Sequence, residues 1–173
     1  MPSKAYGRFL QNLETVTRLQ DSYDIIRTHR GSRGKGAFDH ITRSAVLFLV
    51  SAFEVYIEEV TYECCELNIT LARNADRLPH DVRSAINSYV TKKGSSISPI
   101  DLCDEGWRDV YKQMTQDVID DFNTPKVRQI KDLFSKHIGT TDSRIVGITN
   151  IDRLDDFVRF RGEITHRVKA SSY

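Results

Sequence analysis

Residues 150–168 read NIDRLDDFVRFRGEITHRV, and the spacing of apolar residues in this stretch predicts an amphipathic α-helix. The apolar positions recur every three or four residues, at Ile151, Leu154, Phe157, Val158, Ile164 and Val168. Arg161 occupies the same row, four residues after Phe157 and three before Ile164. Because an unpaired buried cation is costly, we expect its guanidinium either to have a dedicated partner or to face a cleft.

His166 follows Arg161 on this predicted helix, about 140° round it and roughly 7.5 Å along it. Gly162 lies one turn before the histidine, and its missing side chain would leave room between the cation and the imidazole. The stretch therefore predicts a phosphate-sized opening beside a proton-transfer group. The structural alternative pairs Arg161 with Asp156 or Glu54 and leaves His166 on the surface, because an Arg and a His at this spacing also occur by chance.

The rest of the chain predicts an all-α fold, an antiparallel helical bundle forming one domain over residues 1–173. Apolar periodicity predicts helices over residues 3–29, 39–72, 80–89, 104–122, 125–138 and 150–168. Residues 45–56 (AVLFLVSAFEVY) are apolar almost all round, so this helix is expected in the middle of the bundle. Glu54 lies on its narrow polar strip, where it faces either a site or, by default, solvent.

Composition places the chain among globular proteins. Of its 173 residues, 28% are charged and 39% hydrophobic, which is typical of neither disordered nor membrane-embedded chains. No apolar run reaches the roughly 20 residues of a spanning helix, and the N-terminus lacks the apolar core of a signal peptide. We therefore expect no membrane association and a cytoplasmic location. Residues 1–43 and 126–173 are net basic, whereas residues 44–125 are net acidic.

Several kinds of catalytic site are absent from the sequence. There is no serine or cysteine hydrolase signature and no zinc-type HExxH pair. Cys64, Cys65 and Cys103 lack metal-ligand spacing and are expected to be reduced thiols. His137 falls near the end of a predicted helix, where a charged imidazole in a capping role is favoured. We expect no metal and no cofactor.

The segment Arg161-Gly-Glu-Ile-Thr-His166 resembles the R-x(4–6)-H signature of the HEPN domains, an all-α family that contains many RNases. The apolar segment over residues 51–58 is similar to the second helix of HEPN proteins of the RiboL-PSP and related prokaryotic groups, which often carry an acidic residue where Glu54 stands. Gly162 departs from the common pattern, in which Asn or Asp usually follows the arginine.

This resemblance implies a metal-independent endoribonuclease that acts on RNA as a homodimer. The last helices of two subunits would bring both copies of Arg161 and His166 together, so that RNA is cut to 2′,3′-cyclic phosphate and 5′-hydroxyl ends. Supporting site positions are Glu54, Gly162 and Glu163. Candidate RNA contacts are Arg159 and Arg167.

Two alternatives remain open within the same family resemblance. The first is a non-catalytic HEPN-like module that binds a partner protein, such as an antitoxin or another subunit of an anti-phage defence complex. Gly162 and the modest net charge of +1 favour it, whereas the core-facing position of Arg161 favours the enzyme. The second is a module that binds nucleotide, for which the chain offers no second catalytic motif.

Overall fold

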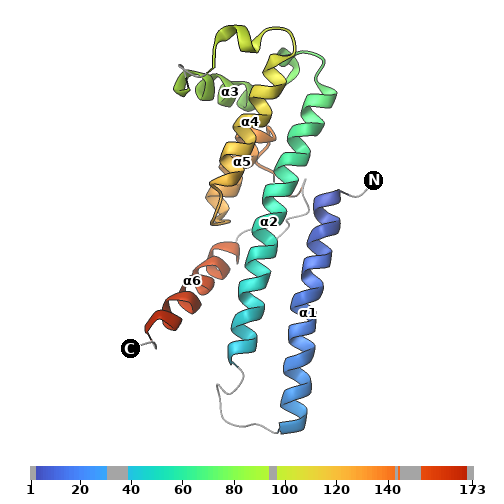
Figure 1. The fold of residues 1–173 in the computed structure, drawn as a ribbon, viewed down its shortest axis with the longest axis vertical. Coiled ribbons are helices and arrows are strands. Elements are labelled where there is room, and N and C mark those ends of the chain that lie inside the picture. The colour runs from blue at the N-terminus through green and yellow to red at the C-terminus, as the bar shows by residue number, and fades with distance from the viewer. Residues whose placement is uncertain (1–2, 31–38, 94–96, 143, 145–152, 171–173) are drawn as a thin grey trace. The chain divides into compact units, whose positions relative to one another are not determined.

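The computed structural model describes residues 3–30, 39–93, 97–142, 144 and 153–170, and side-chain placement within these ranges excludes Arg30, Asp39, Pro99 and residues 165–170. Over this part of the chain the protein contains six α-helices and two short 3-10 helices, with no strand (Figure 1). They are α1 (Lys4–Arg30), α2 (Asp39–Leu71), η1 (Ala75–Arg77), α3 (His80–Lys92), η2 (Pro99–Leu102), α4 (Gly106–Asp120), α5 (Val127–His137) and α6 (Leu154–Ala170). The prediction of an all-α protein is confirmed.

Two compact units divide the chain between them. The first comprises Met1–Tyr56 and Arg153–Tyr173, and the second comprises Ile57–Asp152. Each unit is described by itself below, and the single-domain organisation stays a prediction. None of the described helices is long and apolar enough to span a bilayer.

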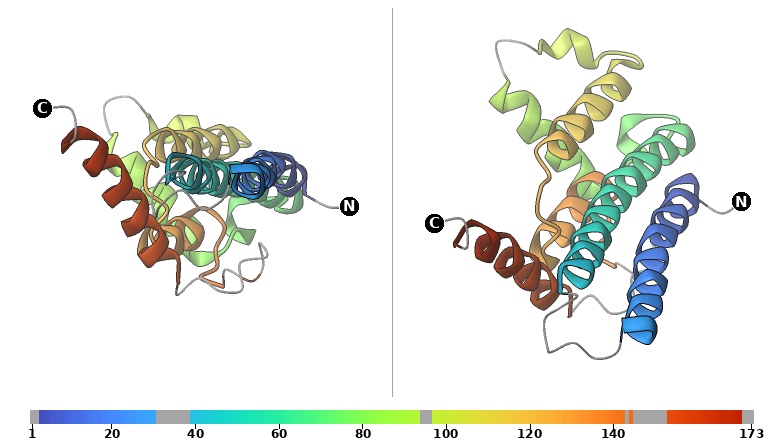
Figure 2. Two further views of the ribbon diagram at one scale, coloured as in Figure 1. Left: turned by 90° about the horizontal axis from the view of Figure 1, so that it is seen from below. Right: turned by 60° about the horizontal axis from the view of Figure 1, so that its bottom comes forward.

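In the first unit, α1 runs alongside the first half of α2 in the opposite direction, as Figure 1 and Figure 2 both show. An aromatic cluster joins the start of α1 to this part of α2. The ring of Phe9 stacks on that of Tyr56 with centroids 4.9 Å apart, and Phe9 meets Phe53 edge-on at 6.4 Å. Phe9 is one of the periodic apolar residues that predict this helix, and its ring contacts place it against α2. Leu10, the next apolar residue, is 46% exposed.

Helix α6 completes the first unit and confirms the helix predicted from its apolar spacing. Asp155 and Asp156 lie in its first turn, where the helix dipole favours negative charge. Val158 and Ile164 are buried, so the predicted face is the packed one. The predicted start at residues 150–152 lies outside the described residues.

The expectation that residues 45–56 lie in the middle of a bundle is wrong for one face of α2. Val50, Ala52 and Tyr56 are buried, but Phe48 and Val55 are exposed. These two residues are seven apart and so lie on one side of the helix. Within the first unit, α1 and α6 are the only other described helices. They leave this side of α2 uncovered.

In the second unit, the last half of α2 packs with α3 and α4 around an apolar core. The members of this core are Cys65, Ile69, Ala72, Leu78, Val82, Ile86, Trp107, Val110, Tyr111 and Met114. A short polar network crosses the interior beside it. The Tyr111 hydroxyl donates to the backbone carbonyl of His137, and Asn68 Nδ2 donates to the Tyr111 hydroxyl at 3.1 Å and to the Ile138 carbonyl at 3.2 Å. This network ties the end of α5 to α2 and α4.

Helix α5 differs from its prediction at the start and agrees with it at the end. The helix predicted over residues 125–138 would place Pro125 in its first turn, where proline is favoured. The observed helix begins at Val127, and Pro125 is fully buried before it. At the other end Gly139 has a φ of +88°, the left-handed conformation that glycine adopts most readily after a helix. A Cβ at this position would clash with the Pro79 ring.

His137 contradicts the prediction of a charged capping imidazole. Its side chain is only 3% exposed, and burial, assisted by the nearby Lys136, lowers its pKa to about 4. The imidazole is therefore neutral at physiological pH. Cys64, Cys65 and Cys103 are all free thiols, as predicted.

Candidate functional site

Arg161 and Glu54 form an ion pair inside the first unit. Nη1 of Arg161 lies 3.7 Å from Oε2 of Glu54, and the two side chains are 30% and 13% exposed, respectively. The interpretation of Glu54 as a solvent-facing group is therefore wrong. The expected need of Arg161 for a dedicated partner is confirmed, because a carboxylate from α2 faces its guanidinium.

The helices position this pair through their apolar neighbours. On α6, Val158 and Ile164 are buried three residues before and three residues after Arg161, which turns Arg161 toward the packed side of the helix. On α2, Val50 is buried one turn before Glu54. The charged pair consequently lies at the margin of a packed apolar layer and is shielded in part from water.

Burial disfavours the charged form of the Glu54 carboxyl. It raises the pKa of the Glu54 carboxyl, and the positive charge of Arg161 opposes this effect without cancelling it. At 3.7 Å the contact is an ion pair and is longer than a hydrogen bond. The arrangement keeps a guanidinium oriented by a carboxylate that is costly to desolvate.

Gly162, which follows Arg161, has room for a side chain among the described atoms. A Cβ built on it would meet none of them within 4 Å, its two chain neighbours and its own helical backbone set aside. Glu163, another predicted supporting residue, is exposed on the next position of α6. Gly162 is next to the ion pair because it follows Arg161 in the chain. No described contact joins Glu163 to the Arg161–Glu54 pair.

His166, the predicted catalytic partner of Arg161, lies on the helical backbone of α6, but its side chain falls outside the described residues. The same holds for the side chain of Arg167. An α-helix rises about 1.5 Å per residue, so the backbones of Arg161 and His166 are separated by about 7.5 Å along the axis. The role of both residues stays a prediction.

Arg159 has a surface partner of its own. Its Nη2 lies 2.9 Å from Oδ1 of Asp156, three residues earlier on α6, and both side chains are largely exposed. Asp156 was one of the two carboxylates considered for Arg161. The structure assigns it to Arg159 and assigns Glu54 to Arg161.

Exposed apolar side chains occur on the same helices as the ion pair, and apolar spacing did not predict their exposure. Phe160 directly precedes Arg161 and is 49% exposed, while Phe48 on α2 is 53% exposed. Val55, the residue after Glu54, is also exposed. Periodicity could not reveal these positions because it does not say which apolar side of a helix lacks a neighbour. Elsewhere in the described residues, no group of three or more His, Cys, Asp or Glu side chains is arranged to hold a metal ion.

Comparison with known proteins gives one finding on family. A comparison with curated proteins and with solved structures found no match. A family model, described as RiboL-PSP-HEPN, matches residues 13–172 and thus covers all six helices in whole or in part. The matched region includes Glu54, Arg161 and His166. The chain therefore belongs to the RiboL-PSP-HEPN family.

Proposed function

We propose that the protein is a metal-independent endoribonuclease that cuts RNA at a site composed of two subunits. The observation that carries the proposal is the Arg161–Glu54 pair, in which a half-buried carboxylate orients a guanidinium on the helix that also bears His166. Membership of the HEPN family supports a ribonuclease. In this proposal Arg161 and His166 are the catalytic residues and Glu54 is a positioning residue.

The chemistry follows from what RNA cleavage through its own 2′-hydroxyl requires. A base removes the 2′-hydroxyl proton, the oxygen attacks phosphorus, and an acid protonates the departing 5′-oxygen, which gives a 2′,3′-cyclic phosphate and a 5′-hydroxyl. A histidine near its ordinary pKa of about 6.5 can act as either base or acid. A guanidinium has five N–H donors in a planar fork, so contact with Glu54 through Nη1 is compatible with binding phosphate oxygens.

One subunit supplies a single candidate histidine, whereas the reaction uses both a base and an acid. A two-fold dimer supplies the second histidine, because it brings His166 and its counterpart to one scissile phosphate. The exposed Phe48 and Val55 on α2 and Phe160 on α6 supply apolar surface on the two helices that carry Glu54 and Arg161, and a second copy would cover it. The proposed dimer therefore buries apolar surface and completes the site with the same helices.

RNA enters such a site as a single strand whose backbone reaches the paired histidines. The space beside Gly162 gives the phosphate room next to Arg161. Arg159 and Arg167, on the same helix, are proposed to contact neighbouring phosphates. The ion pair of Arg159 with Asp156 is exposed and so costs little to exchange for an RNA phosphate.

The test incubates the purified protein with single-stranded RNA in EDTA and identifies the new RNA ends by mass spectrometry. We expect 2′,3′-cyclic phosphate and 5′-hydroxyl ends with the wild type. His166→Ala and Arg161→Ala should each abolish cleavage while circular dichroism retains the helical signal. Arg153→Ala, an exposed arginine just before α6, is the matched control and should cleave normally. Cleavage that persists in His166→Ala, or that stops in EDTA, would refute the mechanism.

A non-catalytic module that binds a partner protein is the second candidate. The observations that favour it are the absence of a polar side chain at Gly162 and the exposed apolar residues of α2 and α6. Expression in a bacterial host separates the two functions. A ribonuclease slows growth of the host, and His166→Ala relieves the effect. A protein that is inert toward every RNA tested, and equally harmless in both forms, supports the module.

A further inference from the structure

Arg43 lies on the same side of α2 as Glu54, three helical turns earlier. Eleven residues separate the two, which places them about 20° apart around the helix and about 16 Å apart along it. Leu47 and Val50 lie in the row between them, and Val50 is buried. Because Glu54 faces Arg161 of α6, the row that contains Arg43 is the row that meets α6.

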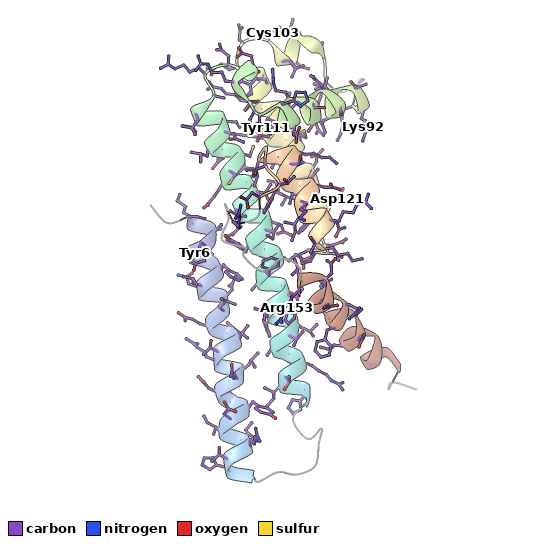
Figure 3. The ribbon with its side chains drawn as sticks, turned by 180° about the vertical axis from the view of Figure 1, so that it is seen from behind. Tyr6, Lys92, Cys103, Tyr111, Asp121 and Arg153 are labelled. Atoms are coloured by element: carbon purple, nitrogen blue, oxygen red, sulfur yellow. The ribbon has the colours of Figure 1, made fainter. Side chains whose placement is uncertain are left out.

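The direction of α6 places the rest of the proposed site toward Arg43. Helix α6 runs toward the end at which α2 starts, as Figure 1 shows and as Figure 3 shows from behind, with Arg153 labelled at the start of α6. The backbone of His166 therefore lies beyond Arg161 in the direction of Arg43, about 7.5 Å further along its own helix. An RNA strand that passes from Arg161 to His166 is thus led toward Arg43.

The side chain of Arg43 is suited to a phosphate. It is half-buried, whereas most arginines in proteins are exposed. An arginine in an apolar row packs its aliphatic stem on the neighbouring side chains and keeps its guanidinium at the water. The guanidinium is always charged, and its planar fork of donors matches the oxygens of a phosphate. Arg43 thus brings the chemistry of a phosphate contact to the margin of the packed layer.

Charge is divided unequally between the two units. The unit that contains α1, the first half of α2 and α6 has a net charge of +5, whereas the other unit has a net charge of −4. A polyanion is attracted to the basic unit and repelled by the acidic one. We therefore expect an RNA strand to follow the helices of the first unit, to which Arg43 belongs.

We propose that Arg43 binds a phosphate of the RNA strand beyond the scissile one, so that arginines of both α2 and α6 hold the strand. This inference rests on the proposed ribonuclease function and names a substrate contact of that same site. Arg159 and Arg167 are the proposed contacts from α6, and Arg43 supplies the corresponding charge from α2. Because the contact is with phosphate, it does not depend on the identity of the base.

Binding of a single-stranded RNA oligomer with 2′-O-methyl groups throughout tests the proposal, because this probe lacks the attacking hydroxyl. Fluorescence anisotropy with the full chain gives its dissociation constant at several salt concentrations. For Arg43→Gln we expect the slope of log K against log salt to become shallower by about 0.7, the value for one phosphate contact on a single strand. At a salt concentration of about 0.1 M this slope corresponds to about fivefold weaker binding.

Matched variants separate a phosphate contact from a structural role. Arg43→Lys keeps the charge and should restore the salt slope, whereas Arg43→Met keeps the apolar stem and should behave as Arg43→Gln does. Arg18→Gln removes the same charge from an exposed position of α1, which lies on the other side of α2 from α6 (Figures 1 and 2), and it should bind as the wild type does. With cleavable RNA, Arg43→Gln should raise KM by about fivefold and leave kcat within about twofold, because a remote phosphate contact is made equally before and during the reaction.

The outcomes distinguish this inference from the proposed function. The role of Arg43 is overturned if Arg43→Gln and Arg18→Gln give the same salt slope, or if Arg43→Lys does not restore it. A wild type that binds the probe but leaves cleavable RNA intact contradicts the ribonuclease alone, and the slopes then still decide the role of Arg43. A wild type that binds no RNA contradicts both.

Discussion

Glu54 is more deeply buried than the cation it faces, so its charge has a cost that its ion pair only partly offsets. Burial raises the pKa of the carboxyl in spite of Arg161. The ion pair is therefore weak evidence for a role in stability alone. In the proposed enzyme Glu54 holds the guanidinium of Arg161 where the phosphate arrives.

Glu54→Gln separates these two roles. The substitution keeps the shape and removes the charge, so we expect RNA cleavage to slow by roughly tenfold or more through loss of Arg161 orientation. The free energy of unfolding should change by less than about 1 kcal/mol, because the pair is partly solvated and Gln is cheaper to bury. Cleavage rates and urea denaturation are the two measurements. A variant that loses stability but cleaves at the wild-type rate would make Glu54 purely structural.

The sequence predicts that Arg161 needs a partner, but it does not distinguish Asp156 from Glu54 as that partner. The choice depends on which helix lies against α6, and periodicity holds no information on that. Asp156 instead pairs with Arg159, three residues away on one helix surface. For the same reason the sequence favours solvent for Glu54, whereas the structure places it opposite Arg161 of α6.

Within the helices, replacing glycine by alanine should have opposite effects on the free energy of unfolding at two positions. Gly162 is in mid-helix with open space around its missing Cβ, so Gly162→Ala should raise the free energy of unfolding by about 0.5–1 kcal/mol. Gly139 ends α5 with a φ of +88° and lies against Pro79, so Gly139→Ala should lower it by about 2 kcal/mol or more. Urea denaturation of both variants measures the difference. Equal effects in the two would contradict the assigned conformations.

His137, at the end of α5, should make the stability of the folded protein depend on pH in the acidic range. Its pKa is about 4 in the folded protein and about 6.5 in an unfolded chain, so between these pH values the unfolded state binds a proton that the folded state does not. The free energy of unfolding should therefore fall as pH drops from 6.5 to 4, by about 3 kcal/mol from this group alone. The raised pKa of Glu54 acts in the opposite direction.

Chemical denaturation at several pH values measures this loss, and His137→Gln is its control. The glutamine can still donate to Thr115 but does not titrate, so its stability should fall less steeply over the same interval even if it is lower throughout. Parallel slopes for wild type and variant would show that the imidazole titrates normally.

Helix positions were predictable where a long apolar stripe exists, and their ends were less so. The apolar stripe of α6 identified the packed face, because burial of one side leaves a 3.6-residue period in the sequence. The predicted start of α5 at Pro125 is wrong, although proline is favoured in a first turn. Pro125 is fully buried, and the helix begins two residues later. The predicted charge on His137 is wrong as well. The end of a helix favours a cation, but burial lowers the pKa of this imidazole and outweighs the helix dipole.

Across the whole molecule, the proposed enzyme depends on a second subunit that one chain cannot replace. The resemblance to HEPN domains implied this dimer, and the single histidine of the final helix supplies a physical reason for it. The sequence could not predict that Phe48 and Val55 on α2 and Phe160 on α6 would be exposed, since their exposure depends on how the helices pack. Phe48→Arg should therefore weaken self-association, which sedimentation velocity measures, and cleavage should decline with the dimer fraction. Val118→Arg, at an exposed apolar position in the second unit, is the control for surface charge.

Hybrid dimers test whether the two histidines act together. Wild type and His166→Ala carrying different tags are co-expressed and purified through both tags, so that each dimer holds one intact His166. If one histidine is the base and its counterpart the acid, the hybrid should be as inactive as the His166→Ala homodimer. A hybrid of wild type with Arg153→Ala, prepared in the same way, should retain full activity. If each subunit instead carried a complete site, the His166→Ala hybrid would keep about half of the wild-type activity, and the composite site would be excluded.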